Sequence, residues 1–183
     1  MSTQNGYAPG LDGIVAAETA LSHVDGLKGE LIIAGFPLAR LAANATFEET
    51  IFLLWNGRLP TQTELTNLKN ELVALRPLPA ATLNLLREAA RARTTPMNAL
   101  RMASATLDLD SREADHLTMA KIVVARIATI VASYHRLRQG AEPVVPDPKL
   151  SHAANFLYML TGEQPSDARV RGLETYLNTV VDH

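Results

Sequence analysis

The chain has 183 residues, enough for one domain with a buried core, and its 47% hydrophobic and 20% charged residues are the composition of a globular protein. A formal net charge of −2 gives it no electrostatic preference for nucleic acid or for an anionic membrane. Cysteine is absent, which excludes a disulfide framework, a thiolate zinc site and a cysteine nucleophile and fits a reducing compartment.

The amino-terminal segment has no pattern of a targeting signal. Residues 1–10 are polar, with neither the basic start nor the apolar run of a signal peptide, and residues 1–9 are expected to form a flexible tail. The most apolar stretch, residues 122–132, is interrupted by Arg126 and is shorter than the ~20 residues that a membrane-spanning helix needs. We therefore expect a cytoplasmic protein with neither a nucleic-acid nor a membrane partner.

Short β-prone runs separated by glycines indicate a small β-hairpin near the amino terminus. The runs are residues 14–16, 21–24 and 31–33, and Asp25-Gly26 and Gly29 supply turn residues between the last two. We expect this hairpin to be the only sheet.

Helical patterns begin after Pro37. Thr46 and Thr61 each precede a glutamate by three residues, which is the capping-box pattern: the threonine oxygen accepts from a free amide and the glutamate reaches back. Gly57 is expected to end the first of these helices and Pro77 the second.

Further helices are expected along the rest of the chain. Pro96 suits a first helical position, because its ring fixes a helical φ and its missing N–H is not needed there. The predicted ranges are 80–93, 96–107, 117–138, 150–160 and 166–183, with an acidic turn at 108–115 and Ser166 as an N-cap. Gly140 and three prolines make residues 140–149 the clearest linker. No stripe sustains a heptad, so we predict an all-α, irregular multi-helix bundle with a small amino-terminal β-hairpin.

The five histidines match no motif for a metal or a nucleophile. None pairs with another at i, i+4 around a glutamate, and the chain has no glycine-rich phosphate loop or nucleophile elbow. His23 falls in the hairpin and His116 in the acidic turn, where we expect both at the surface. His135 lies beside arginines at a helix end, where cations complement the helix dipole. These patterns predict neither a metal site nor a catalytic residue within the chain.

His152 and His183 each have two interpretations. His152 stands at the first turn of a predicted helix, as either a buried, hydrogen-bonded histidine or a ligand-binding one. His183 follows Val180 and Val181, which extend the apolar stripe of the last helix without a closing glycine or proline. That pattern predicts a helix that continues past residue 183, whereas the terminal imidazole by itself would be a solvated group.

An ordered set of segments resembles the citrate synthase family over nearly all of the chain after residue 9. The most specific is residues 151–162, SHAANFLYMLTG, and Asp182-His183 stands where the family has Asp-His or Glu-His before a Gly-x-Asn-Ala-Ser-Thr run. The other matching segments are residues 10–15 (GLDGIV), 21–32 (LSHVDGLKGELI), 46–49 (TFEE), 53–60 (LLWNGRLP) and Pro96-Met97 followed by Leu100-Arg101.

The resemblance implies that residues 10–183 are the amino-terminal portion of the helical large domain of a homodimeric acyltransferase, which condenses acetyl-CoA with oxaloacetate to citrate and CoA. It implies that His183 binds oxaloacetate, that acetyl-CoA is the co-substrate, and that no cofactor or metal is bound. The family's two other histidines and its catalytic aspartate belong to later motifs. The chain is therefore expected to be inactive alone and to associate with itself or with a carboxy-terminal half.

Two other functions stay open at this point. One is a stand-alone helical interaction or regulatory module of the same fold, and the other is part of a 2-methylcitrate synthase that uses propionyl-CoA. Thr95 replaces a histidine that the family often has before Pro-Met, and residues 33–36 depart from a Tyr-Arg-Gly-Tyr-like segment. These departures leave the subfamily open.

Overall fold

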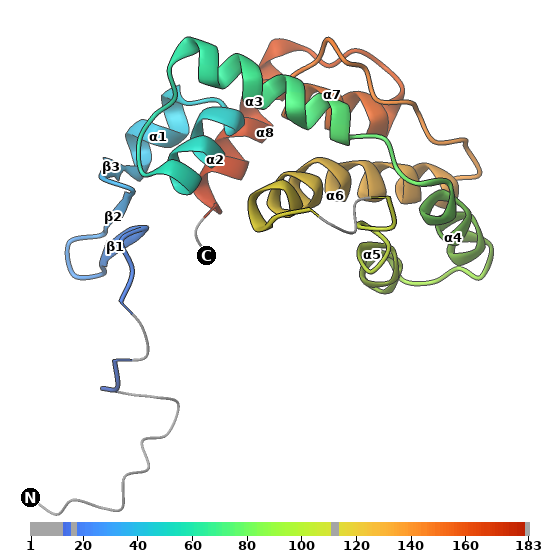
Figure 1. The fold of residues 1–183 in the computed structure, drawn as a ribbon, viewed down its shortest axis with the longest axis horizontal. Helices are drawn as coiled ribbons and strands as arrows, with labels where there is room; N and C mark the ends of the chain where they lie inside the picture. The colour runs from blue at the N-terminus through green and yellow to red at the C-terminus, as the bar shows by residue number, and fades with distance from the viewer. Residues whose placement is uncertain (1–12, 16–17, 111–113, 182–183) are drawn as a thin grey trace, which may run out of the picture.

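The computed structural model describes residues 13–15, 18–110 and 114–181, which form a small sheet followed by helices (Figure 1). The predicted tail at residues 1–9 lies outside the described residues. The strands are β1 (Ser22–Asp25), β2 (Glu30–Ile33) and β3 (Phe36–Pro37). The helices are α1 (Leu38–Asn44), α2 (Phe47–Asn56), α3 (Gln62–Leu75), α4 (Ala80–Arg91), α5 (Pro96–Ser104), α6 (His116–Arg138), α7 (His152–Thr161) and α8 (Asp167–Thr179). The predicted all-α class is confirmed.

The predicted hairpin is present, and a third strand extends it. β1 and β2 pair antiparallel with Ser22 opposite Ile33, and β3 adds to β2 in the order β1-β2-β3. Asp25 Oδ1 accepts hydrogen bonds from the amides of Leu27 and Lys28, which closes the turn in the way expected of an aspartate there. The described residues of the earlier run, Ile14 and Val15, form no strand.

Both predicted capping boxes are confirmed. Thr46 Oγ1 accepts from the amide of Glu49 at 3.2 Å, and Glu49 Oε2 accepts from the amide of Thr46 at 2.7 Å. Thr61 and Glu64 repeat the arrangement at the start of α3, at 3.3 and 2.8 Å. Gly57 ends α2 with a φ of 69°, in the left-handed region that favours glycine.

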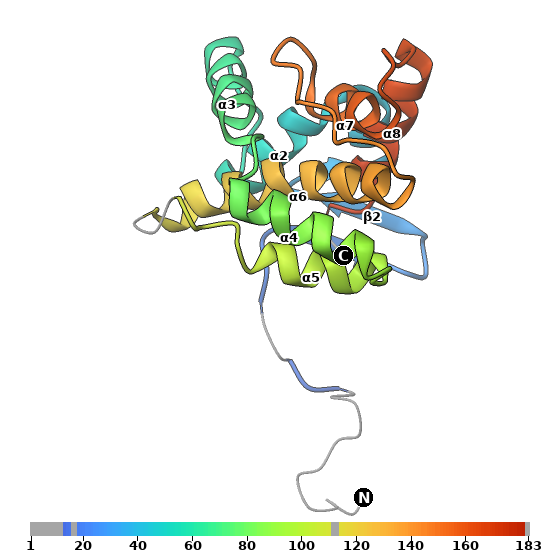
Figure 2. The ribbon, with the colours of Figure 1, turned by 90° about the vertical axis from the view of Figure 1, so that its right-hand side faces the viewer.

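Helix α6 is the centre of the fold. It lies between α4 and α5 on one side and α3 and α7 on the other, so that helices cover it from both sides (Figure 2). Its residues Ile122, Ile130 and Tyr134 are buried in one cluster with residues of α4 and α5. A second cluster joins Ala125 of α6 to α2 and α3, which places the main core around this helix.

By length and composition alone, α6 could cross a membrane, since it has 23 residues and a mean hydropathy of 1.5 over its most apolar window. The apolar stretch of residues 122–132 is therefore shorter than the helix that contains it, and only the whole helix has the length and hydropathy of a membrane span. Arg126 in its middle is 4% exposed and pairs bidentately with Asp110, which lies after α5. The packed helices around α6 and the buried, ion-paired guanidinium of Arg126 are typical of the core helix of a globular domain.

Several element ends differ from the prediction. His116 begins α6 rather than lying in the acidic turn, because Asp115 caps the helix by accepting from the amide of Thr118. Helix α8 ends at Thr179 rather than running to residue 183. Ser166 occupies its N-cap position without a side-chain capping bond.

The predicted linker joins α6 to α7 without regular structure and is tied to the helices. The guanidinium of Arg76, at the end of α3, donates to the carbonyls of Asp147 and Leu150, both at 2.9 Å. Arg87 of α4 pairs with Glu142 at 2.5 Å. The segment thus packs against the helical body.

Candidate functional site

The predicted substrate-binding residue, His183, lies outside the described residues. The described chain reaches Val181, which packs against the buried cluster of Ile33, Leu41 and Leu53. The structure therefore places the backbone two residues before His183 against α1, α2 and β2.

His152 lies in the interior, at the first position of α7, with 7% of its surface exposed. Its ring stacks obliquely on the ring of Phe47, with centroids 5.0 Å apart. Its backbone amide donates to Glu48 Oε1 at 2.9 Å. Burial of His152 is confirmed, and the hydrogen bond at this first turn comes from its backbone rather than from its imidazole.

Two buried charges accompany this histidine. Glu48 is 1% exposed and Arg76 is 2% exposed. The pKa of His152 is lowered to about 4, chiefly by burial. The charge of Glu48 opposes this shift, and the charge of Arg76 contributes to it. Burial also lowers the pKa of Arg76, against the charges of Glu48 and Asp147. A neutral imidazole at neutral pH fits a packing role here.

Two of the remaining histidines, His23 and His135, lie in the elements expected of them, whereas His116 begins α6 instead of lying in the acidic turn. His23 on β1 and His116 at the start of α6 are exposed. His135, near the end of α6, is also exposed, and its Nε2 lies 3.0 Å from Nε2 of Gln139. None of these three lies with His152, so the structure brings no pair of histidines together among them.

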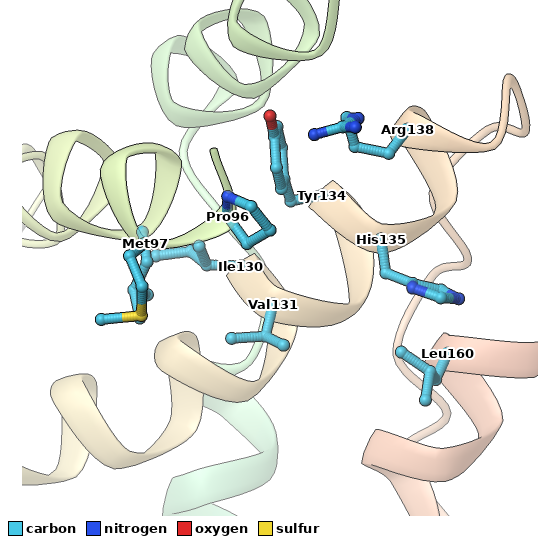
Figure 3. A pocket seen from close by; sticks show the side chains of 9 residues that line it. Pro96, Met97, Ile130, Val131, Tyr134, His135, Arg138 and Leu160 are labelled. Carbon is cyan, nitrogen blue, oxygen red and sulfur yellow. The ribbon is translucent and has the colours of Figure 1, made fainter. Parts of the chain in front are cut away.

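A cavity of about 460 Å³ lies between α5, α6 and α7 (Figure 3). Met97 at its α5 side is 72% exposed, and Val131 of α6 is 37% exposed. The lining residues are Pro96, Met97, Leu100, Ile130, Val131, Tyr134, His135, Arg138 and Leu160.

The polar tips at this cavity are already engaged with the backbone. Tyr134 Oη and Arg138 Nη1 both donate to the carbonyl of Thr94, and Figure 3 shows both tips on the side away from Met97. The rest of the cavity lining is apolar except for His135, which lies at the rim. The sequence predicted a helix over residues 117–138, which contains Tyr134, and a helix start at Pro96, but the juxtaposition of these residues with α7 is a tertiary contact that no local pattern indicates.

Within residues 13–15, 18–110 and 114–181, no group of three or more histidine, aspartate or glutamate side chains is arranged to hold a metal ion. The described site thus consists of a buried polar cluster at Glu48, Arg76 and His152 and an apolar cavity. Neither offers a base and a hydrogen-bond donor that converge on a common point.

Comparison with known proteins gives one consistent family. The model of the family described as "Citrate synthase, C-terminal domain" matches residues 10–183. The citrate synthase of Haloferax volcanii is 38% identical over 95% of this chain, and the citrate/2-methylcitrate synthase of Bacillus subtilis is 34% identical over 91%. These alignments cover 48% and 46% of the two relatives, so the chain spans about half the length of the curated relatives it matches.

Solved structures agree with the sequence relatives. The citrate synthase of Pyrobaculum aerophilum superimposes with a TM-score of 0.86 and 34% identity, over 96% of this chain and 47% of that one. A citrate synthase from Thermoplasma acidophilum, in complex with carboxymethyl coenzyme A and oxaloacetate, has a TM-score of 0.88 over 98% of this chain and 49% of that one. Its identity is 23%, so this second likeness shows the fold alone.

Proposed function

Because the chain belongs to the citrate synthase family, we propose that it is the amino-terminal part of an acyltransferase that condenses acetyl-CoA with oxaloacetate to citrate and CoA. The observation that carries the proposal is the family match over residues 10–183 together with the superposition on a relative of 34% identity. The aligned relatives extend to about twice the length of this chain, so about half of each relative lies outside the alignment.

The condensation of acetyl-CoA with oxaloacetate needs two kinds of catalytic group. A positioned base removes a proton from the acetyl methyl group, and a hydrogen-bond donor stabilises the developing enolate oxygen. Among the described residues, His152 is buried against Phe47 and Arg76 is engaged with backbone carbonyls. We therefore propose that the chain alone is inactive and that the base and the donor come from a carboxy-terminal half.

His183 is proposed to bind oxaloacetate. An imidazolium can form a charge-assisted hydrogen bond to a carboxylate, which suits a histidine to binding a dicarboxylate such as oxaloacetate. On this proposal the chain supplies one wall of the oxaloacetate site, and the groups that act on acetyl-CoA come from a carboxy-terminal half.

We also propose that the chain forms a homodimer or binds a carboxy-terminal half through the apolar face of α5 and α6. Met97 and Val131 on this face are 72% and 37% exposed, and the cavity beside them is apolar. An exposed apolar surface of this kind is typical of a protein–protein contact. The same face also supports the alternative of a helical interaction or regulatory module, which would copurify with a complete synthase.

The acyl donor is a separate question, because relatives named 2-methylcitrate synthase are 34% identical to the chain, as in Mycobacterium tuberculosis. A 2-methylcitrate synthase would use propionyl-CoA in place of acetyl-CoA. Measuring turnover with each donor under the same conditions distinguishes the two activities.

The experiment that tests the proposal measures release of the CoA thiol from acetyl-CoA and oxaloacetate. Three samples are compared: the chain alone, the carboxy-terminal half of a related citrate synthase alone, and the two mixed. We expect turnover only in the mixture. Robust turnover by the chain alone would refute its inactivity, and an inactive mixture that nevertheless forms a complex would contradict the proposed role.

A further inference from the structure

Helix α8 packs a polar face against α1, α2 and α7. Arg171 Nη1 and Asn178 Nδ2 both donate to the carbonyl of Ala45, just beyond the end of α1, at 2.9 and 2.8 Å. Glu174 lies between them on the same face and is 6% exposed, while Asn178 is 0% exposed. Residues four apart in a helix lie one above the other, so Glu174 and Asn178 bring two oxygen-bearing side chains to the same buried contact.

Glu48 brings a carboxylate to this contact from α2. It is 1% exposed, and its Oε1 accepts from the amide of His152 at 2.9 Å. Within the described part of the chain, Glu48 Oε2 and Asn178 Oδ1 are buried and accept no hydrogen bond. A buried acceptor without a donor is costly, so the contact between α2 and α8 is short of donors.

Charges from three helices act on Glu174. Burial and the charge of Glu48 raise its pKa. Its ion pair with Arg171, at 3.2 Å, and the charge of Lys69 on α3 oppose the rise. Arg171 is 37% exposed and Lys69 is also reached by solvent, so water weakens both favourable charges more than it weakens the buried charge of Glu48.

The other ionisable groups of the packed helices are neutral, exposed or engaged elsewhere. The pKa of His152 is lowered to about 4, chiefly by burial, so its ring is neutral from pH 5 upward. Arg76 is held by two carbonyls of the segment between α6 and α7, and its charge acts on Glu48 and His152. Arg40 of α1 is exposed, and Glu49 of α2 closes its capping box.

We propose that the contact between α2 and α8 is pH-sensitive: Glu174 holds a proton while α8 is docked, and its ionisation loosens the helix. A protonated carboxyl carries an O–H donor, which Glu48 Oε2 and Asn178 Oδ1 lack. Ionisation removes that donor and leaves two carboxylates close together in the interior, where their repulsion is little screened. The proposal involves no substrate and is independent of the proposed function.

The raised pKa of Glu174 fixes the direction of the pH effect. Between the ordinary value of 4.5 and the pKa in the folded protein, the folded protein binds a proton that the unfolded chain does not. The stability that this group contributes therefore falls as the pH rises through that window. His152 contributes in the opposite direction, and comparison with a variant that changes only Glu174 removes its effect.

The test compares the wild-type chain with Glu174→Gln and with Glu163→Gln, a control at an exposed glutamate. Glutamine keeps the shape of the side chain, carries a donor and does not titrate. In urea unfolding at pH 5 and pH 8, the unfolding constant of the wild type relative to that of Glu174→Gln should rise at least about threefold with pH. Relative to Glu163→Gln it should stay constant. Parallel pH dependence of the wild type and Glu174→Gln would overturn the proposal.

Amide hydrogen exchange tests whether the loosening is confined to α8. In the wild type, the protection factors of Leu177 and Asn178 should fall at least about threefold from pH 5 to pH 8, relative to those of Leu85 and Leu86 in α4. In Glu174→Gln this ratio should stay constant. Equal changes in α8 and α4 of the wild type would overturn the assignment of the response to α8.

A measurement on the wild-type chain alone covers the case in which Glu174→Gln fails to fold. The side-chain carboxyl carbons of Glu174 and Glu163 can be followed by nuclear magnetic resonance as the pH is changed. We expect Glu174 to titrate at a higher pH than Glu163, because Glu174 is buried beside Glu48 and Glu163 is exposed. A midpoint for Glu174 equal to that of Glu163, or below it, would overturn the proposal.

Discussion

His152 illustrates how burial limits what a histidine can do. Its pKa is about 4 in the folded protein, chiefly because burial penalises the charged ring, whereas an exposed histidine in the unfolded chain titrates near its ordinary value of about 6.5. The sequence predicted the buried position but not the neighbours that define it. Glu48 is 104 residues away along the chain, a separation at which no local pattern indicates a contact.

This histidine predicts a loss of stability in acid. Between pH 6.5 and pH 4 the unfolded chain binds a proton at residue 152 that the folded protein does not, so the free energy of unfolding falls as the pH falls through this window. The full contribution is on the order of 3 kcal/mol. Urea unfolding at pH 7 and pH 4 measures it, with His152→Gln, which does not titrate, as the reference. Equal pH dependence in the two proteins would contradict the account.

Glu48 is predicted to be needed for folding stability. Its carboxylate accepts the first amide of α7 and lies near the buried charge of Arg76, so Glu48→Ala removes an acceptor and leaves that charge less compensated. We expect the free energy of unfolding to fall by about 3 kcal/mol in urea titrations. Glu163→Ala, at an exposed glutamate, should change it by less than about 0.5 kcal/mol. Similar losses in both variants would argue against a buried role for Glu48.

At the scale of the elements, local signals predicted most helix starts. Thr46, Thr61 and Pro96 act through bonds and backbone angles within one turn, so the sequence alone reveals them. Ends and short strands were harder to predict. Helix α8 ends at Thr179, two residues before Val181 packs on the cluster of Ile33, Leu41 and Leu53, and β3 is only two residues long and exists through its pairing with β2.

The capping box of α3 predicts that alanine substitutions at its N-cap and inside the helix change the free energy of unfolding in opposite directions. Thr61→Ala removes an oxygen that accepts from the amide of Glu64, and should lower the free energy of unfolding by about 1 kcal/mol. Thr66 lies at an exposed position inside the same helix, and its hydroxyl donates to the carbonyl of Gln62. Thr66→Ala should raise stability by a few tenths of a kcal/mol, because alanine has the higher helix propensity. Thermal unfolding of both variants measures the difference, and a loss of equal size in each would contradict the capping argument.

At the scale of the whole molecule, the sequence indicated the fold through the order of its motifs, and the superposition at a TM-score of 0.86 agrees with it. The contact between α1 and α8 could not be predicted from local patterns, since Ala45 and Asn178 are 133 residues apart. The candidate site was predicted only in part. Of the two interpretations of His152, the buried position is confirmed, whereas the cavity between α5, α6 and α7 was not predicted and His183 lies outside the described residues.

The apolar face of α5 and α6 predicts self-association. Met97→Glu places a charge on that face and should shift the chain towards monomer in light scattering, because burying an unpaired carboxylate in an apolar contact is costly. Val145→Glu is the control, since Val145 is 80% exposed on the segment between α6 and α7. A wild-type chain that is monomeric at all concentrations, or equal effects of the two variants, would contradict this assignment.

We propose that this chain supplies one wall of an oxaloacetate site whose remaining groups lie in another part of the enzyme. The most direct test is thiol release by the chain mixed with a carboxy-terminal half, repeated with His183→Gln. We expect turnover with the wild-type chain and a loss of at least a hundredfold in kcat/KM for oxaloacetate with the variant, about 3 kcal/mol of lost binding to the transition state. Equal turnover with both chains would contradict it.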